Sequence, residues 1–102
     1  MNIQNLMAQA QKVQKELQKK QEEFYKKEFA FDYGNGAIVI LISGSSEIKK
    51  IKIKKELIDP NDPITLQEMI AEAINSAYQQ IKEKLDKLNE SVVPNSNLGG
   101  LI

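Results

Sequence analysis

Residues 37–43 read Ala-Ile-Val-Ile-Leu-Ile-Ser, and this stretch decides the fold. Side chains alternate between the two faces of a strand, and here both faces are apolar. One face carries Ile38, Ile40 and Ile42, and the other carries Val39 and Leu41. Because such a strand is covered on both sides, we expect it to be the central strand of a small sheet.

The stretches on either side of this strand also alternate and are separated from it by turn residues. Residues 28–33 place Phe29, Phe31 and Tyr33 on one face, and Gly34-Asn35-Gly36 then predicts a tight turn. A second turn at Gly44-Ser45-Ser46 leads into residues 47–55. That third strand carries Ile51 and Ile53 on one face and Lys50, Lys52 and Lys54 on the other. Short connections of this kind predict a three-stranded antiparallel sheet.

One helix is expected before the three strands in the sequence, and another after them. Residues 3–24 repeat apolar positions in steps of three and four, which is the spacing of a helix that packs along one narrow stripe. Its members are Ile3, Leu6, Ala10, Val13, Leu17 and Phe24, with Lys20 as the one break. A second helix follows a loop with two prolines. We expect a capping box at Thr65–Glu68, a broad apolar stripe from Leu66 to Leu88, and an end near Asn89.

These elements predict an α+β fold with the order α-β-β-β-α and long N- and C-terminal helices. Residues 1–90 are expected to form one domain for binding and dimerisation, and residues 91–102 a flexible C-terminal tail. One small domain has too little material to cover both faces of the central strand and the seam of the first helix, so we expect a symmetric homodimer. The residues assigned to dimerisation are Val39, Leu41, Ile51 and Ile53.

Composition narrows the possible functions. The chain has 102 residues with 14 lysines, 14 acidic residues, no arginine, no histidine and no cysteine. Disulfides, cysteine metal sites and the commonest general base are thereby excluded. Neither a long apolar run nor a signal peptide is present, so we expect a soluble intracellular protein without a membrane partner. No nucleophile motif is found, so we expect that the protein is not an enzyme. We also expect that it binds no cofactor, no metal and no small-molecule substrate.

Four segments resemble the YbaB/EbfC family of nucleoid-associated proteins. Residues 5–15, Asn-Leu-Met-Ala-Gln-Ala-Gln-Lys-Val-Gln-Lys, are similar to the family's N-terminal helix. Residues 36–39, Gly-Ala-Ile-Val, resemble its G-x-V-x-V strand. Gly44 with Ile48, Ile51 and Ile53 resembles its next segment, and residues 66–77 resemble its second helix. The resemblance covers roughly residues 3–101.

The resemblance implies a cytoplasmic, nucleoid-associated homodimer that binds double-stranded DNA, organises the chromosome and affects gene expression. It also implies a dimer core centred on the sheet, with helices projecting as arms. Arginine makes bidentate contacts to guanine that lysine reproduces poorly, so a chain without arginine is expected to bind the DNA backbone and not to read bases.

Lysines are the candidate phosphate partners, because neutralising phosphates releases counterions. The resemblance favours the helical arms over the strand lysines Lys50, Lys52 and Lys54, which alternatively protect a sheet edge against aggregation. A charged helix face is otherwise usually just solvated. The predicted DNA-binding residues are Lys12, Lys15, Lys19, Lys20, Lys26 and Lys27 of the first helix and Lys82, Lys84 and Lys87 of the second.

Two other interpretations stay open. Phe29, Phe31 and Tyr33 form either part of the core or a stacking platform for single-stranded nucleic acid, and their period of two favours the core. The heptad pattern of the first helix and the zero net charge also suit a dimeric protein–protein adaptor.

Overall fold

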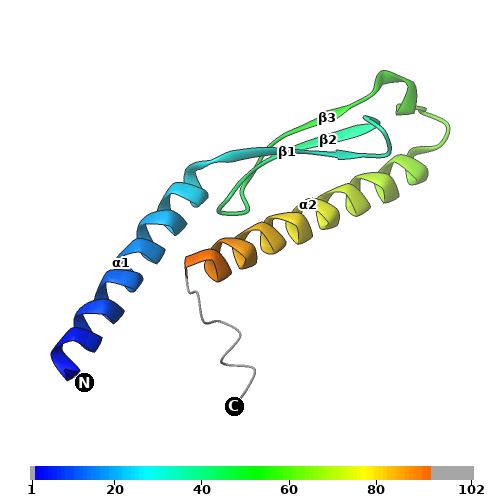
Figure 1. Ribbon diagram of the computed structural model, residues 1–102. Helices are drawn as coiled ribbons and strands as arrows, with labels where there is room; N and C mark the ends of the chain where they lie inside the picture. Colours follow the sequence, from blue (N-terminus) through cyan, green and yellow to red (C-terminus); the bar gives the residue numbers. More distant parts are fainter. Residues whose placement is uncertain (1, 93–102) are drawn as a thin grey trace, which may run out of the picture.

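The computed structural model describes residues 2–92 (Figure 1). Helix α1 spans Ile3–Lys26 and leads into strands β1 (Glu28–Tyr33), β2 (Ile38–Ser43) and β3 (Ile48–Ile53). A short 3-10 helix, η1 (Lys55–Leu57), precedes the second long helix, α2 (Pro63–Val92). This order confirms the predicted α-β-β-β-α arrangement of an α+β fold. The molecule is elongated, 71 × 28 × 17 Å, because α1 extends away from the sheet.

The sheet is antiparallel, with the order β1-β2-β3. At the first hairpin Gly34, Asn35 and Gly36 have φ values of 64°, 53° and 86°, the left-handed conformations that glycine and asparagine adopt at low cost. Residues paired across strands point to the same face. Phe31, Ile40 and Ile51 therefore share the face toward α2, whereas Ala30, Leu41 and Lys50 share the opposite face, which we call the outer face.

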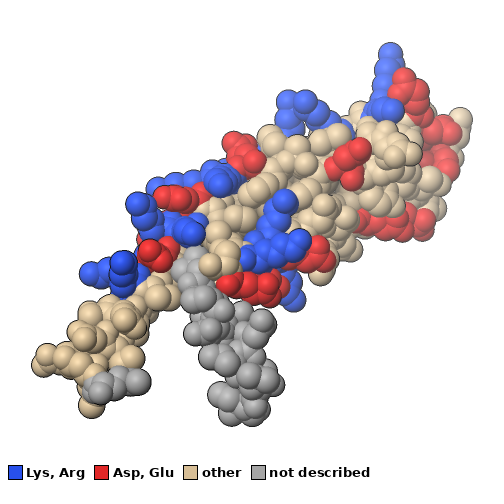
Figure 2. Space-filling model, viewed as in Figure 1, with Lys and Arg blue, Asp and Glu red and all other residues tan. Residues whose placement is uncertain are grey.

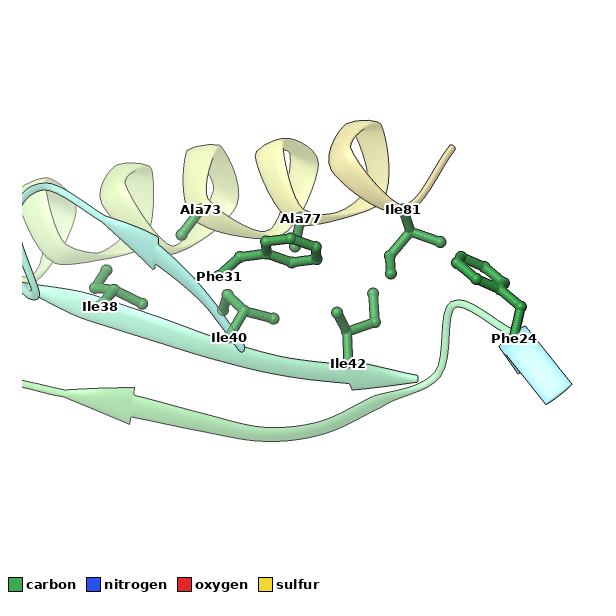
Figure 3. Close-up of a cluster of buried hydrophobic side chains, with 8 residues drawn as sticks. All are labelled: Phe24, Phe31, Ile38, Ile40, Ile42, Ala73, Ala77 and Ile81. Carbon is green, nitrogen blue, oxygen red and sulfur yellow. The ribbon is translucent and has the colours of Figure 1, made fainter. Parts of the chain in front are cut away.

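The core lies between α2 and the inner face of the sheet. Figure 3 shows the isoleucines of β2 pointing toward α2, with Phe31 beside them. Ile38, Ile40 and Ile42 are fully buried, and each contributes roughly 1.5–3 kcal/mol through its burial. The small side chains of Ala73 and Ala77 let α2 approach the sheet closely. One face of the central strand is thus covered within the chain, as its apolar pattern predicts.

The junction between α1 and the sheet is short and tightly packed. Lys27 is the one residue between α1 and β1, and its carbonyl accepts a 2.9 Å hydrogen bond from the Gly44 amide. Phe24, at the end of α1, is buried in the core. A Cβ atom on Gly44 would stand only 1.9 Å from the Phe24 carbonyl oxygen. The last turn of α1 is therefore pressed against the backbone of the β2–β3 turn.

The start of α2 differs from the expected capping box. Asp62, not Thr65, receives the capping bonds: its carboxylate accepts from the Thr65 amide at 3.3 Å and the Thr65 hydroxyl at 2.7 Å. These bonds lower the pKa of Asp62 below its ordinary value. Pro63 becomes the first helical residue, where its fixed φ and missing N–H carry no penalty.

The end of α2 lies beyond the predicted one. The helix continues to Val92, so the first two residues of the expected tail are helical. The rest of that tail, residues 93–102, lies outside the described residues.

Candidate functional site

Helix α1 presents lysines and apolar residues on opposite faces. At 3.6 residues per turn, Lys12, Lys15, Lys19 and Lys26 fall within an arc of about 60°. The centre of that arc lies on the side of the helix opposite the apolar stripe of Ile3, Leu6, Ala10, Val13, Leu17 and Phe24. Figure 2 shows lysines gathered along α1, with carboxylates among them. We call these four residues the α1 lysine face.

The ammonium groups of this face form no ion pairs with nearby carboxylates among the described residues. Within residues 2–92, the one lysine–carboxylate pair closer than 4.0 Å is Lys49–Glu47, at 3.3 Å. An open depression of about 380 Å³ runs along α1 between Lys12, Lys15, Lys19 and their neighbours. Its walls all come from one helix, so it offers a surface for an extended anion more readily than an enclosure for a small molecule.

The other two predicted lysines of this region lie elsewhere. Lys20 lies at the edge of the apolar stripe, about 20° beyond the direction of Val13. Lys27 follows the last turn of α1 and belongs to the junction with the sheet. The structure thus brings four of the six predicted first-helix lysines together on one face.

The predicted lysines of α2 do not form one surface. Lys82 and Lys84 lie about 160° apart around the helix. The Lys84 ammonium stands 5.5 Å from the ring centroid of Phe29 and 6.0 Å from that of Phe31. These two rings are stacked at 6.1 Å. A cation–π contact at an exposed site contributes about 0.5–1 kcal/mol, so Lys84 helps to hold α2 against β1.

The aromatic residues of β1 belong to the core and do not form an open platform. Phe31 is buried, and Phe29 and Tyr33 are half-buried against the core. The Tyr33 hydroxyl donates to the Glu72 carboxylate on α2, and this bond raises the pKa of Tyr33 above its ordinary value. The core interpretation of their period-two spacing is therefore confirmed.

The strand register divides the residues assigned to dimerisation. Val39 and Leu41 are half-buried on the outer face, whereas Ile51 and Ile53 pair with Ile40 and Ile38 and point to the α2 side. The four residues cannot form one flat interface. On the outer face, Val39 and Leu41 have acidic residues on one side and lysines on the other. The acidic residues are Glu28 and Asp32 of β1, and the lysines are Lys50 and Lys52 of β3.

Residues 2–92 contain no candidate metal site and no membrane-spanning helix. Among these residues there is no cluster of three or more aspartate, glutamate, histidine or cysteine side chains that is arranged to hold a metal ion. Neither α1 nor α2 contains a stretch long and apolar enough to cross a membrane.

Comparisons with known proteins agree with one another. The model of the YbaB/EbfC DNA-binding family matches residues 1–95. A nucleoid-associated protein of Malacoplasma penetrans is 45% identical over 92% of this chain and 99% of the relative. One from Clostridium acetobutylicum is 39% identical over 98% of this chain and 89% of the relative. The crystal structure of an uncharacterized Helicobacter pylori protein is similar in fold, with a TM-score of 0.71 at 19% identity. It covers 91% of this chain and 98% of that one.

Proposed function

The chain belongs to the YbaB/EbfC DNA-binding family, and from this premise we propose that it binds double-stranded DNA as a homodimer, chiefly through lysine–phosphate contacts of α1. Curated relatives are named nucleoid-associated proteins, which supports a place on the bacterial nucleoid in the cytoplasm. We propose that the dimer organises the chromosome there and influences gene expression.

The observation that carries the DNA contact is the α1 lysine face. From Lys12 to Lys26 this face extends over about 21 Å of helix, while each strand of the duplex presents one phosphate per roughly 3.4 Å along its axis. Several phosphates therefore come within reach of one arm. Lysine interacts with phosphate as a point charge, and the chain has no arginine to make bidentate contacts with guanine. Binding that tolerates many sequences follows from this chemistry.

The test is a fluorescence-anisotropy titration of a labelled duplex of ~30 base pairs at two or more salt concentrations. If around six phosphates are neutralised per dimer, the slope of log affinity against log salt is expected to be about −5. Raising the salt from ~50 to ~200 mM then weakens binding roughly a thousandfold. No binding at low salt, or binding that salt leaves unchanged, contradicts the proposal.

The outer face of the sheet supports the homodimer. Its centre, Val39 and Leu41, is apolar, and charges of opposite sign lie on the two edge strands. A twofold axis parallel to the strands places β1 of one protomer over β3 of the other. In that arrangement Asp32, which lies level with Lys52 across β2, faces the partner's Lys52. The alternative axis, across the strands, places acidic residues over acidic residues. We therefore propose face-to-face dimerisation in the first orientation.

Replacing Leu41 with glutamate is expected to convert the dimer into a monomer. A carboxylate at the centre of the interface would be buried without a partner, and this weakens association by at least about 100-fold. The measurement is the molecular mass by light scattering after size exclusion. Ile51→Glu is the matched control, since Ile51 is 36% exposed and points to the other face. If the Leu41→Glu protein keeps the mass of two chains, the outer face is not the interface.

A further inference from the structure

The free end of α1 is apolar and uncharged in a way that the DNA contact does not explain. Residues 2–11 contain no lysine, aspartate or glutamate, and Figure 2 shows this end of α1 without charged side chains. Ile3, Leu6 and Met7 are 72%, 47% and 59% exposed. Three large apolar side chains on an otherwise uncharged helical segment form a surface that favours contact with another macromolecule.

The same apolar stripe is already used closer to the sheet. Phe24 is buried, Leu17 and Val13 are half-buried, and the Gln21 amide donates a 2.9 Å hydrogen bond to Asn89 of α2. Toward its beginning the stripe loses its cover within the described residues, since Ala10, Met7, Leu6 and Ile3 are all exposed. A helical segment of about twelve residues without tertiary packing is marginally stable in water, so a partner here would also stabilise the helix.

We propose that residues Ile3–Val13 are a second self-association surface, which pairs antiparallel with the same segment of a chain from another dimer. The heptad spacing selects a helix as the occupant. In the antiparallel register whose twofold axis crosses the seam at the height of residue 8, Leu6 packs opposite the partner's Ala10, and Ile3 opposite the partner's Val13. Each layer thus combines a larger side chain with a smaller one, and Met7 meets the partner's Met7 beside the axis.

Charge favours the same occupant. The positions that flank this seam are Met7, Gln9 and Gln14, so two copies approach without repulsion between like charges. The α1 lysine face lies on the opposite side of the helix and stays free. One arm therefore contacts DNA with one face and a neighbouring dimer with the other.

The contact is small, and it acts mainly between dimers that DNA already holds side by side. Eleven residues per helix bury less than the ~1,000 Å² of a stable independent interface. Neighbouring dimers on one duplex experience a high effective concentration of each other, which compensates for weak intrinsic affinity. The cooperative consequence rests on the proposed DNA binding, whereas the pairing of the helix ends does not.

Chemical cross-linking tests the pairing itself. The chain has no cysteine, so a Met7→Cys variant carries one thiol, which is expected to lie beside its counterpart in the pair. With a short bismaleimide and the full-length protein at high concentration, we expect Met7→Cys to be linked at least roughly ten times faster than Lys15→Cys, whose thiol is on the opposite face. The linked Met7→Cys product is expected to have the native mass of two joined dimers. Equal rates for the two variants overturn the proposal.

A double variant, Leu6→Gln with Met7→Gln, tests the consequence on DNA. Both side chains are exposed, so the fold should be retained, which circular dichroism checks. On a duplex that holds one dimer the affinity is expected to stay within about twofold of the original, while cooperativity on a duplex several times longer is lost. Unchanged cooperativity overturns the proposal. If the unaltered protein binds no DNA, the proposed function fails, and the cross-linking rates still decide whether the helix ends pair.

Discussion

Replacing Gly44 with alanine is expected to lower the free energy of unfolding by roughly 3 kcal/mol or more. The added methyl group would lie 1.9 Å from the Phe24 carbonyl oxygen and 2.6 Å from its carbonyl carbon. Both atoms belong to the backbone of the last turn of α1, which cannot move aside without disturbing the buried Phe24 ring. For a domain of this size the loss corresponds to a fall in the melting temperature of more than about 10 °C.

Gly34→Ala is the matched control for this prediction. Gly34 has a φ of 64°, and a Cβ atom there would lie 3.3 Å from the Ala37 Cβ. Alanine at this position is destabilised by the left-handed conformation, by about 1–2 kcal/mol, but its methyl group does not collide with the backbone. Thermal unfolding followed by circular dichroism compares the two variants. Equal losses of stability would show that the close approach of α1 to the β2–β3 turn has no special importance.

Replacing Lys12, Lys15 and Lys19 together with glutamine is expected to abolish most DNA affinity. In the proposed dimer the substitutions remove six positive charges from the two α1 lysine faces, and the fold should be unaffected because all three side chains are exposed. Affinity at low salt is expected to fall at least about 100-fold, and the salt slope to become much shallower, since Lys26 is the one member of the α1 lysine face that remains on each arm. Anisotropy titrations at several salt concentrations measure both quantities.

A charge-matched variant separates this surface from the overall charge of the protein. This variant carries glutamine in place of Lys49, Lys54 and Lys55, which lie on β3 and in the segment that follows it. Its net charge changes by the same amount. That variant is expected to keep its affinity within a few-fold and to keep most of its salt slope. If both triple variants bind equally weakly, net charge and not the α1 lysine face governs the association.

Local patterns in the sequence were sufficient to predict most of the fold. The alternation in residues 37–43 predicts the central strand, and the steps of three and four predict α1, because both depend on the periodicity of a single element. The capping residue of α2 is Asp62, three residues before the predicted Thr65, and the sequence pattern does not separate the two because both are good capping residues. Pro63 was the usable signal, because proline favours the first position of a helix.

The candidate site was harder to predict, because its geometry depends on contacts between distant elements. The grouping of Lys12, Lys15 and Lys19 follows from helical spacing alone. The position of Lys84 over Phe29 depends on how α2 lies across β1, which no local pattern indicates. The separation of Ile51 from Leu41 likewise depends on the pairing of β3 with β2, which includes an irregularity between Leu41 and Ile42. The register between β2 and β3 decides which of their side chains share a face, and this register is set by the assembled sheet.

The one-residue junction at Lys27 fixes the orientation of α1 relative to the sheet. With the Gly44 amide bonded to the Lys27 carbonyl and Phe24 buried, α1 has little freedom to swing relative to the sheet. In the proposed homodimer, two such arms would hold their lysines at a set separation before DNA binds. For that proposed complex we expect a small loss of conformational entropy on binding and a preference for duplexes whose curvature matches the separation of the arms.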